Sequence, residues 1–128
     1  MSQGLVLIAD DDPDFISELT KILVDRGYLV LGAKDGQAAA DLLNKFQLPF
    51  SLAIVDVFMP MMGGFELIRR LAEDKANLKI IAVSGGRQKV LDAAMSLGAD
   101  AGIKKPPPNT PLDAKQWLDE VFKQIGLS

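Results

Sequence analysis

Acidic and basic residues stand where apolar segments of this chain end, and together they could bind a divalent cation and a phosphoryl group. The run Asp10–Asp12 directly follows one apolar segment, and Asp56 directly follows another. Lys105 lies just beyond a third, before Pro106. Mg²⁺ prefers oxygen ligands and is commonly bound by one or two carboxylates together with a phosphate oxygen. A site for phosphoryl transfer is therefore the first hypothesis.

The residue types at these positions suit one reaction. Crowded carboxylates repel one another, and a bound Mg²⁺ would remove that repulsion. Asp56 could then attack phosphorus and form an aspartyl phosphate. Lys105 would neutralise one oxygen of the transferred group, and Ser84, which follows a further apolar segment, could donate a hydrogen bond to another. Each residue thus has a distinct expected role.

Each residue also has a simpler interpretation. Asp10–Asp12 could act only as helix caps, and Asp12 is expected to be one. Asp56 alone could be an ordinary loop acid, Ser84 with its following glycines a turn, and Lys105 a solvated lysine. Their ordered placement after four separate apolar segments favours the joint site.

Unbroken apolar segments predict the strands that must position these residues. Residues 5–9, 52–55 and 80–83 are apolar throughout, which is typical of strands buried on both faces. Residues 28–33 and 101–103 are interrupted by glycine, which favours the edges of a sheet. Five strands are expected.

Amphipathic helical patterns follow each of the predicted strands. The first helix is expected to begin at Pro13, with Asp12 as its cap. The fourth is expected over residues 87–97, with Leu97 facing inward, and the last after a capping box at residues 110–113. Strands and helices therefore alternate along the whole chain.

This alternation predicts an α/β fold of the (βα)₅ type, with a doubly wound, flavodoxin-like parallel sheet in strand order 2-1-3-4-5. Ligands of such sheets bind beyond the carboxyl ends of the strands that flank the switch point. Here those are the first and third strands, which brings Asp10 and Asp11 beside Asp56. Ser84 and Lys105 are expected at the same edge.

Composition narrows the function further. The chain has 128 residues, no cysteine and no histidine, which excludes disulfide frameworks, zinc fingers and histidine-based catalysis. One domain over residues 1–128 is expected. The net charge of −3 argues against direct binding to nucleic acid or to an anionic membrane. No signal peptide or membrane-spanning segment is visible, so a cytoplasmic location is expected.

The motifs resemble those of the receiver domains of two-component response regulators, a family that includes the chemotaxis regulator. The resemblance covers essentially the whole chain. Its motifs are residues Ile8–Pro13, Asp56–Pro60 with Gly64, Val83–Gly85, Gly98–Asp100 and Lys105–Pro106.

Specific roles follow from this resemblance. It implies that Asp56 is the phosphoacceptor and that Asp10, Asp11 and the main-chain carbonyl of Phe58 hold Mg²⁺ together with it. Ser84 and Lys105 would then contact the phosphoryl oxygens.

The resemblance also identifies a partner and a backbone feature. The phosphoryl group is expected to come from a phosphohistidine on a sensor histidine kinase or a histidine phosphotransfer protein. The bond between Lys105 and Pro106 is expected to be cis, an isomer found in about 5–6% of such bonds.

Two positions depart from the family pattern. Gly102, three residues before the lysine, stands where receivers commonly carry the tyrosine or phenylalanine that moves with the serine or threonine hydroxyl. Any output change is therefore expected in the loop after Ser84, where Gly85 and Gly86 permit backbone rearrangement. Phe58 is expected to overhang the site and exclude water, which predicts a long-lived phosphoryl group.

Two other functional classes stay open. A pseudo-receiver would use the same fold for binding without phosphorylation, and the missing aromatic makes this conceivable. A phosphatase or phosphotransferase working through an aspartyl intermediate is disfavoured, because such enzymes commonly carry a second carboxylate where this chain has Phe58. The leading prediction is a phosphorylation-controlled signalling domain rather than an enzyme.

Overall fold

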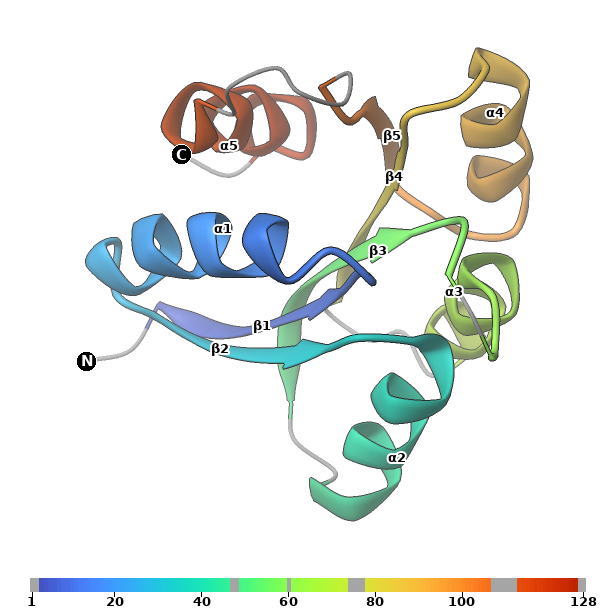
Figure 1. Ribbon diagram of the computed structural model, residues 1–128, viewed down its shortest axis with the longest axis horizontal. Helices are drawn as coiled ribbons and strands as arrows, with labels where there is room; N and C mark the ends of the chain where they lie inside the picture. The colour runs from blue at the N-terminus through green and yellow to red at the C-terminus, as the bar shows by residue number, and fades with distance from the viewer. Residues whose placement is uncertain (1–2, 47–48, 60, 74–77, 107–112, 127–128) are drawn as a thin grey trace.

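A parallel sheet with helices on both faces forms the protein (Figure 1). The computed structural model describes residues 3–46, 49–59, 61–73, 78–106 and 113–126. The strands in chain order are β1 (Gly4–Ala9), β2 (Tyr28–Ala33), β3 (Phe50–Asp56), β4 (Lys79–Ser84) and β5 (Ala101–Lys104). The helices are α1 (Pro13–Asp25), α2 (Gly36–Phe46), α3 (Gly64–Glu73), α4 (Gln88–Ser96) and α5 (Ala114–Gln124).

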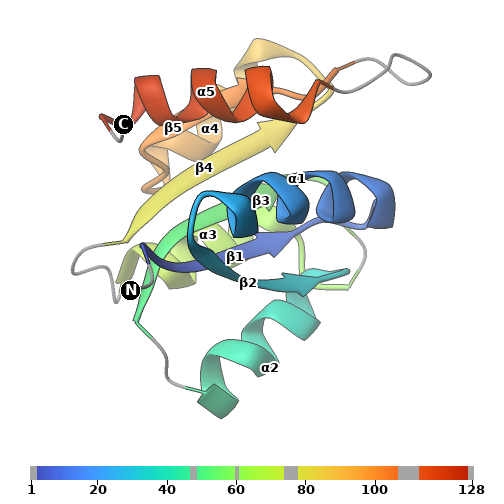
Figure 2. The same ribbon diagram turned by 90° about the vertical axis from the view of Figure 1, so that its left-hand side faces the viewer.

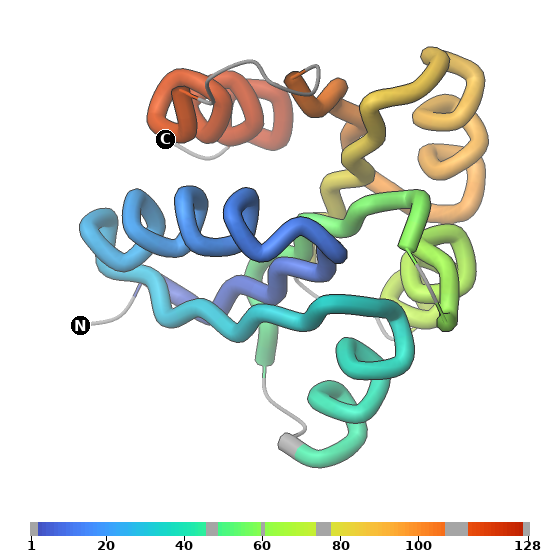
Figure 3. The backbone as a smooth tube through the Cα atoms, in the orientation of Figure 1, coloured from blue at the N-terminus to red at the C-terminus, as the bar shows by residue number. Residues whose placement is uncertain are grey.

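The sheet has the strand order β2-β1-β3-β4-β5, and all neighbouring strands are parallel. This confirms the predicted flavodoxin-like fold, including the placement of β2 and β5 at the edges. β1 and β3, whose ends carry the acidic residues, are direct neighbours in register at Ala9 and Val55. The backbone that continues from β1 and the backbone that continues from β3 therefore leave the sheet side by side, at the carboxyl ends of the strands (Figure 3).

Two apolar layers hold the helices to the sheet. Because successive side chains of a strand point to opposite faces, Leu7 and Ala9 of β1 lie in one layer, and Val6 and Ile8 lie in the other. The first layer packs against α2, α3 and α4, and the second against α1 and α5, as Figures 1 and 2 show. Burial on both faces explains why the central strands are apolar without interruption.

The start of α1 agrees with the prediction from sequence. Pro13 is its first residue, and the Asp12 side chain accepts hydrogen bonds from the amides of Asp14 and Phe15, at 3.0 and 3.4 Å. Asp12 therefore acts as the helix cap. This leaves the two preceding aspartates available for another role.

Helix α4 corrects one expectation. Leu97 does not face inward: its side chain is 38% exposed, whereas Leu91 and Ala94 are buried. Leu97 is the residue that caps α4 at its C-terminus, and the chain turns away at Gly98, which has a φ of 123°. Beyond the last helical turn, the helical period no longer determines which way a side chain points.

The start of α5 differs from the predicted capping box. The helix begins at Ala114, and the carboxylate of Asp113 accepts a hydrogen bond of 3.0 Å from the amide of Gln116. Asp113 is thus the cap, in keeping with the strong preference for aspartate at this position. The residues expected to open the helix, 110–112, lie outside the described part of the chain.

The expectation of a cis bond before Pro106 is wrong. No peptide bond within the described ranges is cis, so Lys105 and Pro106 are joined in the trans form. The trans isomer of such a bond is intrinsically favoured by about 0.5–1 kcal/mol.

Over the described ranges, no helix combines the length and apolar character required to cross a lipid bilayer.

Candidate functional site

Three carboxylates meet beyond the ends of β1 and β3. One oxygen atom from each of Asp10, Asp11 and Asp56 lies within 4.8 Å of the other two. Asp10 and Asp56 are buried, and Asp11 is exposed, so the cluster opens to solvent on one side. The pairing of β1 with β3 produces this convergence, because each aspartate follows or ends a strand at the same edge.

Asp10 is almost completely buried, at 1% exposure, and is bound by both backbone and side-chain donors. Its Oδ1 accepts a hydrogen bond of 2.9 Å from the amide of Asp12. The Nζ of Lys105 donates to both of its oxygens, at 2.9 and 3.0 Å. Burial raises the pKa of the Asp10 carboxyl, and the bond from Lys105 opposes this shift.

Asp56 ends β3 and has a perturbed acidity. Burial, followed by repulsion from the nearby Asp10, raises the pKa of its carboxyl from 3.8 to about 6. A hydrogen bond of 3.1 Å from the amide of Phe58 acts in the opposite direction. A hard cation beside these carboxylates would favour their charged forms. The donor set therefore fits a divalent metal ion with oxygen ligands.

Gly64 determines how closely α3 approaches the end of β3. A Cβ atom at this position would overlap with the carbonyl oxygen of Asp56 and lie 2.5 Å from the Cα of Val57. The amide of Gly64 also donates to the carbonyl of Val57, at 3.0 Å. Only glycine can bring the start of a helix this close to the strand that carries Asp56.

Lys105 reaches the acidic cluster from the end of β5. Its amide donates to the carbonyl of Ser84 at 3.0 Å, which continues the pairing of β4 with β5. Its side chain is 19% exposed, and Nζ contacts Asp10 and lies over the ring of Phe15, whose centroid is 4.4 Å away. The structure thus brings the predicted lysine to the predicted carboxylates.

Ser84 and Phe58 both lie close to Gly86, in the turn after β4. Ser84 is fully buried, and its Oγ accepts a hydrogen bond of 3.0 Å from the amide of Gly86. A Cβ atom on Gly86 would lie 3.3 Å from this Oγ and 3.8 Å from Cε2 of Phe58. Phe58 is 59% exposed. Its ring therefore lies beside the glycine turn. The expected exclusion of water by this ring and the role of the Phe58 carbonyl as a metal ligand stay predictions.

Gly102 is in direct contact with helix α4. A Cβ atom on Gly102 would lie 2.8 Å from the Cβ of Leu91 and 3.5 Å from its Cα. The helix thus packs against the backbone of β5 at Gly102, the position where receivers commonly carry an aromatic ring. Sequence reasoning identified the absent aromatic but not the side chain that faces its place.

Phe15 is a buried residue of α1 that contacts the lysine. Its position beneath the Lys105 ammonium has no signal in the sequence, since apolar residues at helical spacing indicate only a buried face. The contact joins the first turn of α1 to the residue after β5, two parts of the chain that are far apart in sequence, so no local pattern reports it.

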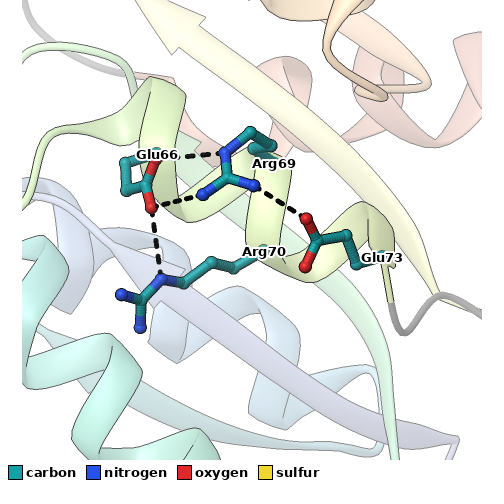
Figure 4. Close-up of polar contacts among 4 residues, drawn as sticks. All are labelled: Glu66, Arg69, Arg70 and Glu73. Carbon is teal, nitrogen blue, oxygen red and sulfur yellow. Dashed lines mark hydrogen bonds and ion pairs between the residues drawn. The ribbon is translucent and has the colours of Figure 1, made fainter.

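A second group of charged residues lies on the surface of α3 (Figure 4). Arg69 bridges Glu66 and Glu73, each at 2.7 Å, and Arg70 reaches Glu66 at 3.4 Å. The bond from Arg69 lowers the pKa of Glu66. These pairs join neighbouring turns of one exposed helix, where such contacts add little to stability. They are the ordinary solvated face of an amphipathic helix.

Comparison with known proteins agrees with this fold. The family model described as the response regulator receiver domain matches residues 6–115. The chain therefore belongs to the response regulator receiver family. Receiver domains are the signalling domains of two-component systems, and phosphorylation-based signalling is their general function.

Individual relatives support the assignment. The chain is 35% identical over 120 residues to the response regulator receiver protein CpdR of Brucella abortus, a match covering 94% of this chain and 95% of CpdR. It is also 39% identical over 102 residues to the response regulator GtcR of Aneurinibacillus migulanus. That match covers 79% of this chain but only 41% of GtcR, so this relative is much longer.

Solved structures share the whole architecture. A CheY-like receiver domain protein from Methanospirillum hungatei superposes with a TM-score of 0.81 at 26% identity, covering 98% of this chain and 95% of that one. The CheX–CheY complex of Borrelia burgdorferi with BeF₃ and Mg²⁺ gives a TM-score of 0.78, also at 26% identity. It covers 95% of this chain and 89% of that one.

Proposed function

We propose that this chain accepts a phosphoryl group from a phosphohistidine donor onto Asp56 and thereby changes its binding to a partner. Asp10, Asp11, Asp56 and the main-chain carbonyl of Phe58 would hold Mg²⁺. The observation that carries the proposal is the convergence of three carboxylates with the ammonium of Lys105 at one edge of the sheet. A sensor histidine kinase or a histidine phosphotransfer protein would supply the donor.

The transfer exchanges one bond to phosphorus for another. An oxygen of Asp56 attacks phosphorus, the bond from phosphorus to the donor imidazole nitrogen breaks, and the imidazole leaves with that electron pair and takes up a proton. When bound, Mg²⁺ supplies positive charge that offsets the charges of the carboxylates and the phosphoryl oxygens.

Lys105 and Ser84 would each donate a hydrogen bond to an oxygen of the phosphoryl group. Lys105 now pairs with both oxygens of Asp10, and a modest movement of its flexible stem would give Nζ a phosphoryl oxygen instead. Ser84 accepts its present bond through Oγ, so its hydroxyl hydrogen can be donated to a second oxygen. Positioned donors of this kind are the main protein contribution to phosphoryl transfer.

The proposed output route runs through Phe58 and Gly86. Asp56 accepts from the amide of Phe58, and Ser84 accepts from the amide of Gly86. A phosphoryl group on Asp56 that also engages the Ser84 hydroxyl would disturb both bonds. The Phe58 ring lies beside that glycine turn. We therefore expect beryllofluoride with Mg²⁺ to shift the amide NMR signals of Phe58 and of residues 84–90. Unmoved signals in a protein that binds beryllofluoride would refute this route.

Intact-mass measurement tests the phosphorylation itself. Incubation with Mg²⁺ and a small phosphodonor such as acetyl phosphate is expected to add one retained phosphate, and Asp56→Asn is expected to abolish the addition. Asp12→Asn is the matched control, because asparagine caps a helix as well as aspartate does. It should retain phosphate as the unmodified chain does. Phosphate on Asp56→Asn, or none on the unmodified chain, would contradict the proposal.

The same incubation distinguishes the two alternatives when released inorganic phosphate is measured together with the intact mass. A pseudo-receiver would gain no phosphate under any of these conditions. An enzyme would release many equivalents of inorganic phosphate for each protein molecule. Phe58 carries no acid that could protonate a leaving group, so rapid turnover is not expected.

A further inference from the structure

Phe15 lies against the lysine of the candidate site. The ring centroid is 4.4 Å from the Nζ of Lys105, well within the range of a cation–π interaction. Phe15 is only 4% exposed, so its position is fixed by its surroundings. It belongs to the first turn of α1, directly after the acidic run. The ammonium of Lys105 is thus bounded by Asp10 on one side and by an aromatic ring on another.

Helix α5 contacts both the ring and the end of β5, next to the lysine. Trp117 packs against Phe15 in an edge arrangement, with centroids 5.3 Å apart and planes at 82°. The indole N–H of Trp117 donates to the carbonyl of Lys104, at 3.1 Å. One side chain therefore fixes the ring and the backbone next to Lys105. This arrangement is more constrained than an incidental contact between a core residue and a mobile lysine.

The two neighbours of the ammonium differ in one important respect. Asp10 can bind the lysine or a metal ion, and carboxylate oxygens engaged by a cation are weaker partners for an ammonium. The ring face carries a permanent negative potential and does not bind Mg²⁺ in place of oxygen ligands. With a side chain that is only 19% exposed, Lys105 has limited access to water as a substitute.

We propose that Phe15 is a positioning residue for Lys105, holding its ammonium beside the acidic cluster when Asp10 turns to the metal. Nζ is then ready to meet a phosphoryl oxygen instead of moving out to solvent. This inference rests on the proposed function, because it concerns the same phosphoryl site. A purely structural Phe15 would affect stability but not the environment of Lys105.

The first test compares Phe15→Leu with Phe122→Leu. Phe122 is a similarly buried phenylalanine of α5 in the same apolar layer, so it controls for the loss of a ring from the core. Phe15→Leu is expected to weaken beryllofluoride binding in saturating Mg²⁺ by about twofold to thirtyfold, the range for a cation–π contact. Affinity for Mg²⁺ alone should change by less than about twofold. Phe122→Leu should change neither affinity.

A spectroscopic measurement reports the contact directly. The ring current of Phe15 should shift the ε-methylene NMR signals of Lys105 to high field. Phe15→Leu should remove this shift, and Phe122→Leu should retain it. If the signals of Lys105 are the same in Phe15→Leu as in the unmodified chain, the ring does not hold the lysine and the inference is wrong.

Replacement of Phe15 by trifluorophenylalanine tests the charge of the ring face without leaving a cavity in the core. Fluorine withdraws charge from the ring face but nearly preserves its shape, so beryllofluoride binding should weaken without a loss of thermal stability. Equal binding by this variant and the unmodified chain would overturn the positioning role alone. Failure of the unmodified chain to bind beryllofluoride would instead overturn the proposed function, and the positioning role with it.

Discussion

Replacing Asp56 with asparagine is expected to make the metal-free protein more stable at neutral pH. The fold raises the pKa of Asp56 from 3.8 to about 6, first through burial and then through repulsion from Asp10. Each pKa unit corresponds to about 1.4 kcal/mol, so the ionised carboxylate costs the folded state about 3 kcal/mol. Asparagine has nearly the same shape and can still accept the hydrogen bond from Phe58.

The gain should depend on pH in a defined direction. Above pH 6 the wild-type carboxylate is charged in both the folded and the unfolded chain, and its cost to folding is complete. As the pH falls from 6 to 3.8, the folded chain takes up a proton before the unfolded chain does, which stabilises the wild type. The advantage of Asp56→Asn should therefore be largest above pH 6 and disappear below pH 4.

Urea denaturation in the presence of a chelator measures this difference. At pH 7.5 the variant is expected to gain about 2–3 kcal/mol in free energy of unfolding, or roughly 10 °C in Tm for a chain of this size. Asp12→Asn, which alters a half-buried capping residue outside the acidic cluster, provides the control for removing one negative charge. Mg²⁺ should narrow the gap, because it stabilises the folded wild type by binding.

Two results would refute the reasoning about Asp56. One is a variant that is no more stable than the wild type at pH 7.5. The other is a gain of the same size at pH 7.5 and pH 4, which would show that the charge of the carboxylate is not its cause.

Three further substitutions test close contacts around the site. Gly102→Ala is expected to cost about 1–3 kcal/mol in urea denaturation, and Leu91→Ala in the same chain should recover part of this loss. Gly64→Ala should cost about 3 kcal/mol or more and reduce phosphate uptake by intact mass, because its Cβ meets backbone; Gly63→Ala, with no atom within 4 Å, should do neither. Phe58→Asn should speed loss of the phosphoryl group, followed by mass spectrometry, by up to about a hundredfold; unchanged or slower loss would count against water exclusion.

The sheet and the acidic cluster were predictable from sequence because each depends on a strong, local signal. Strands buried on both faces must be apolar throughout, so β1, β3 and β4 are visible without any structure. Their order follows from the handedness of the crossovers. Once the order is fixed, the positions of Asp10, Asp11 and Asp56 follow from chain geometry alone.

Features that depend on tertiary contact were not predictable in the same way. Leu97 follows the helical period of α4 but lies where the helix has ended, so periodicity assigned it wrongly. The contact of Phe15 with Lys105 joins two elements far apart in the chain. The isomer before Pro106 reflects a balance of about 1 kcal/mol that sequence similarity does not determine.

The close approach of Gly102 to Leu91 has a consequence for how related sequences vary. A strand without a side chain at this position and a bulky residue on the facing helix fill one volume between them. Relatives with glycine at the first position should therefore retain a large aliphatic residue at the second. Relatives that place an aromatic ring on the strand should carry a smaller residue opposite it, so the two positions are expected to covary.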